Sequence, residues 1–177
     1  MQKIAQFSEH NLTWSQPSAG KMEYELRSGG ELVATLKVRS TFGTLATAES
    51  GDGCWTFKRV AFWQSKASIR ACRSDTDLAV FKNNTWDSGG TLEFSDGCNF
   101  KATTNLWMTN FEFKTEADEP LVRFEYGGVF SRRAKVDISP LARSTPQVPL
   151  FVLFGWYLVI MLDADVAGAS AAIISTM

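Results

Sequence analysis

The feature that most constrains the fold is a run of fifteen residues, 148–162, without a single charged side chain. It reads VPLFVLFGWYLVIML, and Pro149 suits the first turn of a helix, where a missing N–H costs nothing. On a helix with 3.6 residues per turn, this run is apolar on every face. Such a helix must be enclosed either by protein or by lipid.

The length of the run distinguishes burial inside protein from insertion into a membrane. Fifteen helical residues span about 22 Å, whereas a bilayer core is about 30 Å thick. Extending the uncharged segment back to Ser144 adds Pro146, and Asp163 and Asp165 close the other end without a following Lys or Arg cluster. The sequence therefore favours a hydrophobic helix over about 148–163 that is buried inside protein.

The preceding sequence, from about 22 to 139, alternates between apolar and polar residues as half-buried strands do. In 31–39, four residues (Leu32, Ala34, Leu36 and Val38) share one face, and Val33 is the exception. The same alternation covers 22–27, 122–126 and 134–139, with shorter runs at 67–73, 78–82, 91–95, 98–102 and 106–114 and weaker ones near 4–8, 44–48 and 55–63. Glycine-rich turns between them predict an antiparallel meander of eleven or twelve strands.

A strand count this high explains where the helix goes. Eight strands close around side chains alone, whereas about eleven or more leave room for a central helix. Closure also removes the exposed edges of a long meander. We therefore predict one mainly β domain over 1–177, a closed antiparallel barrel of about twelve strands around a hydrophobic C-terminal helix.

Three segments of this layout, Gly90–Cys98, Leu121–Tyr126 and Pro149–Leu162, resemble the tubby C-terminal-like superfamily. This superfamily includes tubby proteins, plant LURP-one-related proteins and phospholipid scramblases, and the resemblance implies a twelve-stranded barrel around a helix. The small size is most similar to the LURP-one-related branch. The Pro-rich region, cysteine cluster and acidic calcium segment of scramblases are absent, and so is the terminal tubby signature from 164–177. From tubby proteins, the resemblance implies binding of phosphoinositides or other anionic lipid headgroups as a class.

The charge balance restricts where an anion could bind. Eighteen Lys and Arg against nineteen Asp and Glu give a net charge of −1, so no global basic field favours nucleic acid. The densest local group of cations, and our candidate anion or lipid site, is Arg132, Arg133, Lys135 and Arg143. The alternative is that these four cations belong to a solvent-exposed face, where their charge balances that of the acidic residues in 112–119. A looser group, Lys58, Arg59, Lys66 and Arg70, is interleaved with Trp55, Phe57, Phe62 and Trp63, which we interpret as core aromatics.

Residues for catalysis or metal binding are scarce. Cys54, Cys72 and Cys98 are widely spaced, which predicts reduced, mostly buried thiols rather than a disulfide framework or a zinc site. The single histidine, His10, is interpreted as a surface residue. The segment 163–174 has the start of a calcium loop but lacks most of its ligands, and no glycine-rich phosphate loop is present. We expect no catalytic residue, cofactor or metal.

The function expected from the sequence is a non-catalytic, monomeric binding domain for an anionic lipid headgroup or a protein partner. We expect no nucleic-acid partner and no stable membrane insertion. The first ten residues carry Lys3 and Glu9 and lack the apolar stretch of a secretory signal, so we expect a cytoplasmic protein that associates peripherally with a membrane. Two alternatives remain: a membrane-attached, scramblase-like protein anchored by 148–162, and a small enzyme with its site in the barrel mouth or a surface cleft.

Overall fold

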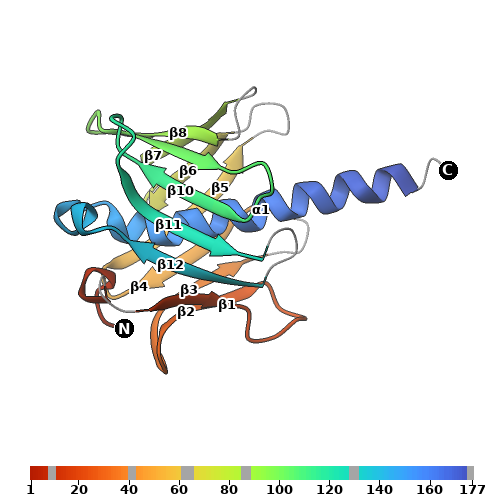
Figure 1. Ribbon diagram of the computed structural model, residues 1–177, viewed down its shortest axis with the longest axis horizontal. Helices are drawn as coiled ribbons and strands as arrows, with labels where there is room; N and C mark the ends of the chain where they lie inside the picture. Colours follow the sequence, from red (N-terminus) through yellow and green to blue (C-terminus); the bar gives the residue numbers. More distant parts are fainter. Residues whose placement is uncertain (8–10, 40–42, 61–65, 85–88, 128–131, 175–177) are drawn as a thin grey trace.

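The computed structural model describes residues 1–7, 11–39, 43–60, 66–84, 89–127 and 132–174. Twelve antiparallel strands form a closed barrel in which each strand pairs with its neighbours in sequence, and the last pairs with the first (Figure 1). The strands are β1 (Leu12–Ser15), β2 (Glu23–Ser28), β3 (Glu31–Val38), β4 (Ala46–Ser50), β5 (Gly53–Val60), β6 (Lys66–Ala71), β7 (Asp77–Asn84), β8 (Gly89–Phe94), β9 (Asn99–Thr104), β10 (Asn110–Lys114), β11 (Pro120–Tyr126) and β12 (Arg133–Ile138). The predicted fold class is confirmed.

The long helix α1 (Val148–Ile174) enters the barrel at one end and extends beyond it at the other, which we call the exit end (Figure 1). It begins where the expected helix begins and continues past 163. The strand ends Ser15, Val38, Val60, Asn84 and Thr104 lie at the exit end, whereas the tight turns at 29–30, 51–52 and 95–98 lie at the opposite end. Two short 3₁₀ helices, η1 (Ile4–Phe7) and η2 (Pro140–Ser144), also lie at the opposite end.

The core is the space between α1 and the inward faces of the strands. In β12, Ala134, Val136 and Ile138 are buried, while the residues between them point outward. Every residue of α1 from Leu150 to Met161 is buried, so the helix that is apolar on all sides is enclosed by protein. The stretch Val148–Asp165 is long and apolar enough to span a membrane, but 78% of it is buried inside the barrel.

Two buried aromatic side chains form hydrogen bonds between the helix and the wall. The Trp14 indole Nε1 donates to the Val152 carbonyl at 3.3 Å, and the Tyr157 hydroxyl donates to the Thr44 carbonyl at 2.7 Å. Around these hydrogen bonds, stacked and edge-on pairs of aromatic rings fill the space between α1 and the barrel wall, which we call the annulus. They include Phe113 with Phe151 and Trp14 with Trp156. These contacts fix the depth and rotation of α1 in the barrel.

Two local predictions are wrong, and one strand was not predicted. The weak strand near 4–8 is a 3₁₀ helix over Ile4–Phe7, held where the Ile4 N–H donates to Asp52 Oδ2 at 2.7 Å. The strand expected over 106–114 begins only at Asn110, because the Asn105 side-chain oxygen accepts from the Thr109 and Asn110 N–H groups and closes a turn. Strand β1 has no counterpart among the predicted strands.

The exception to alternation at Val33 has a structural cause. The register between β2 and β3 passes from Leu26 paired with Ala34 to Arg27 paired with Leu32, so Val33 has no opposite residue. A bulge of this kind turns one extra side chain inward. Val33 is buried as a result, and Leu32 is only half-buried.

The prediction of reduced, mostly buried cysteines is wrong. Cys54 and Cys72 form a disulfide with a Cα–Cα distance of 5.4 Å, because the register of β5 and β6 pairs Trp55 with Ala71 and so places the next residues opposite each other. The Cys72 N–H also donates to the Cys54 carbonyl at 2.9 Å. Cys98 is a free thiol, but it is exposed, at the β8–β9 turn.

Candidate functional site

The structure separates the four predicted cations. Arg132 and Arg133 lie at the start of β12, at the exit end, and Lys135 lies further along the outer face of the same strand. Arg143 is exposed on η2, beyond the other end of β12. The predicted group of four therefore cannot converge on one ligand, although Arg133 and Lys135 are on the same face.

Arg133 and Lys135 share an open groove of about 1010 Å³ on the outside of the barrel, across β2, β1, β12 and β11. The register aligns outward side chains in two rows: Arg27, Thr13 and Lys135 in one, and Glu25, Ser15 and Arg133 in the other. The groove is lined by Asn11, Thr13, Ser15, Arg27, Gly29, Glu125, Tyr126, Gly127, Arg133 and Lys135. The Thr13 hydroxyl thus lies between two cations, and the Ser15 hydroxyl lies between Arg133 and the acidic Glu25. We call this cavity the outer groove.

The cations of the outer groove already have partners. Arg27 Nε donates to Glu25 Oε2 at 2.9 Å, and its second nitrogen donates to the Gly30 carbonyl at 2.7 Å. Lys135 lies 3.0 Å from Asp137, and this hydrogen-bonded carboxylate raises the pKa of Lys135. The Lys135 pair is solvent-exposed and the Arg27 pair is partly exposed, so both are weak and an incoming anion can exchange with them.

Arg132 lies next to Arg133 at the exit end, but its side chain does not line the outer groove. Its carbonyl accepts from the Gln16 N–H at 3.1 Å, and its side chain acts electrostatically on Tyr24. Burial, followed by the negative charge of Asp163, raises the pKa of Tyr24, while the charge of Arg132 lowers it. Arg132 thus lies near the buried Tyr24 and is not among the residues that line the outer groove.

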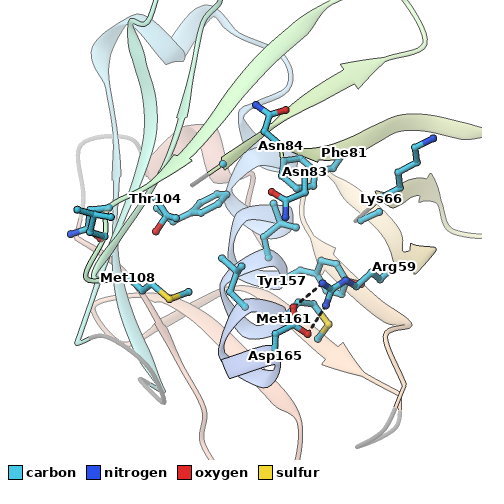
Figure 2. Close-up of a pocket in the computed structure, with 17 residues that line it drawn as sticks. Arg59, Lys66, Phe81, Asn83, Asn84, Thr104, Met108, Tyr157, Met161 and Asp165 are labelled. Atoms are coloured by element: carbon cyan, nitrogen blue, oxygen red, sulfur yellow. Dashed lines mark hydrogen bonds and ion pairs between the residues drawn. The ribbon is translucent and has the colours of Figure 1, made fainter. Parts of the chain in front are cut away.

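A second cavity, about 420 Å³, lies at the exit end between α1 and the wall formed by β5 to β10 (Figure 2). We call it the mouth pocket. Its apolar part consists of Ala67, Phe81, Phe111, Leu158, Met161 and Leu162. Its rim consists of Arg59, Lys66, Asn83, Asn84, Gly89, Thr104, Asn105, Leu106 and Met108, with Tyr157 and Asp165 on the helix side.

The mouth pocket exists because the aromatic filling stops. Phe154 contacts Phe57 and Phe81, and Tyr157 stacks on Phe154 with ring centroids 5.7 Å apart. After Tyr157, the side chains of α1 are aliphatic or Met as far as Leu162, and the barrel wall opposite contributes the small Ala67 beside Phe81 and Phe111. The shorter side chains of α1, together with Ala67, leave part of the space between helix and wall unfilled.

One ion pair closes the helix side of the mouth pocket. Arg59 of β5 binds Asp165 of α1 through two hydrogen bonds of 2.8 and 2.7 Å (Figure 2). The hydrogen bond that Arg59 donates to Asp165 raises the pKa of Arg59. Next to it, burial raises the pKa of Tyr157 to about 12, despite the nearby Arg59 charge. At neutral pH the Arg59 guanidinium therefore stays positively charged and the Tyr157 hydroxyl stays neutral.

The outer lip of the mouth pocket is strongly apolar. Leu106 is 91% exposed and Trp107 is 82% exposed, in the turn between β9 and β10. Asn105 holds this turn by its side-chain hydrogen bonds to Thr109, and Met108 adopts a positive φ of 49°. The two large side chains are therefore presented to solvent by an ordered turn.

Sequence reasoning found only part of these two sites. It identified Arg133 and Lys135 but missed Thr13 and Ser15, because β1 was not predicted. Arg59 and Lys66 were in the looser basic group and line the mouth pocket. From the same group, Arg70 pairs with Asp77, and Phe57 is buried in the core as interpreted. Phe62, Trp63 and His10 lie outside the described residues.

Comparison with known proteins identifies a fold and no family. The sequence matches no family profile and no curated protein. An X-ray structure of the Arabidopsis thaliana protein AT5G01750 matches with a TM-score of 0.57 and 9% sequence identity, covering 88% of this chain and 92% of the plant protein. At this identity, the match establishes a shared fold over most of both chains.

Proposed function

We propose that this chain is a non-catalytic domain that binds the anionic headgroup of a membrane lipid in the outer groove. The observation that carries this proposal is the row across three adjacent strands in which the Thr13 hydroxyl lies between Arg27 and Lys135, with Ser15 beside Arg133 in the next row, where Glu25 is its other neighbour. Phosphate oxygens accept hydrogen bonds from both kinds of group, and the bonds from charged donors are the stronger.

The spacing suits one phosphate group. Neighbouring strands are about 4.8 Å apart, so Arg27 and Lys135 start roughly 10 Å from each other, on either side of Thr13. Their long side chains can both reach an anion placed over the Thr13 hydroxyl. At a membrane surface, each such cation contributes about 1 kcal/mol.

The fold supports a family assignment as part of the proposal. We propose that the chain belongs to the tubby C-terminal-like superfamily, and that it works as a monomer at the cytoplasmic face of a membrane. A twelve-stranded barrel around a C-terminal apolar helix is what the sequence resemblance implies. The fold shared with the plant protein supports the same assignment.

Vesicle binding tests the proposal. Sedimentation with phosphatidylcholine vesicles, alone or doped with phosphatidylserine or phosphatidylinositol bisphosphate, measures the contribution of the anionic lipid. We expect wild-type protein to sediment only with the doped vesicles. Removing two groove cations in Arg133→Glu/Lys135→Glu should weaken binding by roughly 2 kcal/mol, or about thirtyfold.

The matched control is Arg143→Glu, which reverses an exposed charge at the opposite end of the barrel. It should bind the doped vesicles as wild type does. Equal losses in the groove and control variants would mean general electrostatic attraction, and the outer groove would not be the site. Absence of wild-type binding to every vesicle would also reject the proposal.

A further inference from the structure

The mouth pocket has the chemistry of a ligand site separate from the outer groove. Its volume of about 420 Å³ lies within the range of small-molecule pockets, which are mostly apolar with a few polar groups. It is lined on β5 to β10 and α1, whereas the outer groove is lined on β1, β2, β11 and β12. The two cavities share no lining residue, so they can be tested independently.

The apolar part of the mouth pocket is suited to a flexible chain. Phe81, Phe111 and Leu158 provide a wall without polar atoms, and Met161 and Met108 add unbranched side chains. Methionine adapts its shape at little cost and is common where a binding surface must accommodate different conformations. Leu106, which lines the cavity, and its chain neighbour Trp107 add exposed apolar side chains at its outer edge.

The rim determines the head group. Arg59 is neutralised by Asp165, which leaves Lys66 as the rim cation for which the described part of the chain contains no ion pair. The exposed amides of Asn83 and Asn84 lie on β7, on the strand next to Lys66, and have no side-chain hydrogen bond to any described residue. In Figure 2, Asn83 points toward the helix residues Tyr157 and Met161, whereas Asn84 and the Lys66 ammonium group lie at the outer edge of the rim and point away from them. Among the described residues, the Asn83 amide and the Lys66 ammonium group, which its flexible side chain can bring over the rim, favour an anionic head.

We infer that the mouth pocket binds a single apolar chain that carries an anionic head group. The chain lies between α1 and the β6–β10 wall, and the head lies at the rim, near Lys66 and Asn83. A free fatty acid and a lysophospholipid share this chemistry. The Arg59–Asp165 ion pair holds the helix side of the pocket in place, so the cavity is present before the ligand arrives.

Calorimetric titration with monomeric amphiphiles tests this inference. Dodecanoate and lysophosphatidic acid represent the two sources, and dodecyltrimethylammonium presents a similar chain with a cationic head. We expect both anionic amphiphiles to bind with one-to-one stoichiometry, and the cationic one to bind at least fivefold more weakly. Tighter binding of lysophosphatidic acid assigns the site to a lipid, and tighter binding of dodecanoate assigns it to a free fatty acid.

Two variants locate the ligand. Ala67→Phe puts a ring into the cavity from β6 and should abolish binding, with thermal melting used to confirm that the variant folds. Lys66→Glu, at an exposed position, should weaken dodecanoate binding about fivefold, the factor that an exposed ion pair contributes. Lys58→Glu is the matched control, because Lys58 is exposed on the neighbouring strand and does not line the cavity.

Three results would overturn the inference. These are no binding of either anionic amphiphile, many molecules bound per chain with the same affinity in wild type and Lys66→Glu, and equal affinity for the cationic and anionic amphiphiles. If Ala67→Phe does not fold, Lys66→Glu against Lys58→Glu still decides. The outer-groove proposal is unaffected by any of these outcomes, because none of the variants touches Arg133 or Lys135.

Discussion

Gly155 provides the sharpest test that α1 is a core helix. It lies in the middle of the enclosed part of α1, where a Cβ atom would be 2.5 Å from Cε2 and Cζ of Phe124 and 3.1 Å from Cε2 of Phe113. Real Cβ atoms essentially never lie within 3.0 Å of such a heavy atom, and ordinary van der Waals contact lies at 3.4–4 Å. Both phenyl rings are fully buried and cannot swing into solvent. We therefore expect Gly155→Ala to destabilise the protein.

The size of the effect is a difference of two opposing contributions. Alanine favours an isolated helix over glycine by about 1 kcal/mol. Overpacking a well-filled core costs about 1–3 kcal/mol, and the short distances to two buried rings place this site at the upper end. The net expectation is a loss of about 2 kcal/mol in the free energy of unfolding. For a chain of this size, that corresponds to a fall in Tm of roughly 4–8 °C.

Urea denaturation of single and double variants measures these contributions. Ala164→Gly, at an exposed position of the same helix, is the matched control and should cost about 1 kcal/mol from helix propensity alone. Phe124→Leu shortens the ring that the new methyl group meets. The double variant Gly155→Ala/Phe124→Leu should therefore be at least about 1 kcal/mol more stable than the sum of the two single effects predicts.

An increase in stability on Gly155→Ala would refute the reasoning, as would strict additivity in the double variant. Either result is what a helix facing lipid would give, because nothing would then lie 2.5 Å from the added methyl group. The same experiment therefore separates the core helix from the alternative in which 148–162 anchors the chain in a membrane.

Two further predictions concern the disulfide and the buried tyrosine. The Cys54–Cys72 bond closes a loop with a sequence separation of 18, so Cys54→Ala/Cys72→Ala should lower the free energy of unfolding by about 3 kcal/mol in urea titrations under oxidising conditions, and a change under 1 kcal/mol would contradict this. Thiol trapping in cells followed by a non-reducing gel shows whether the bond forms there; a fully reduced pair supports the proposed cytoplasmic location, and an oxidised pair contradicts it. Because burial raises the pKa of Tyr157 to about 12, the folded state holds this proton more tightly than the unfolded state, so stability should fall as pH rises from 10 to 12. Tyr157→Phe should reduce that slope, which urea titrations across this range measure.

The fold was predictable because both of its signals are local. Alternation along a strand and the absence of charge along 148–162 are properties of consecutive residues, and closure follows from the number of strands. The strand β1 escaped prediction because Leu12–Ser15 is only four residues long and shows one and a half periods of alternation. Its absence from the prediction also hid the outer groove, since Thr13 and Ser15 lie on it.

The disulfide was not predictable for a different reason. Cys54 and Cys72 become neighbours only through the register of β5 against β6, and a spacing of 18 residues has no meaning without that register. The separation of Arg143 from Lys135 has a similar cause, because β12 carries the chain from one end of the barrel to the other between them. Two residues that are close in sequence can therefore lie far apart in the barrel when the chain between them runs along a strand.

The mouth pocket depends on a mismatch between two surfaces, which no single segment encodes. A twelve-stranded barrel encloses more width than one helix fills, so side chains must occupy the annulus. Aromatic residues on both surfaces do this as far as Tyr157, where Phe57 and Phe154 meet it. Beyond that point α1 carries shorter side chains while the barrel keeps its width, so a cavity opens at the end where the helix leaves. If the aromatic side chains ended early at the opposite end, the core beside η2 would be exposed. Because they end early at the exit end, an apolar cavity with a charged rim forms there. This difference between the two ends is the reason that we place ligand binding at the exit end.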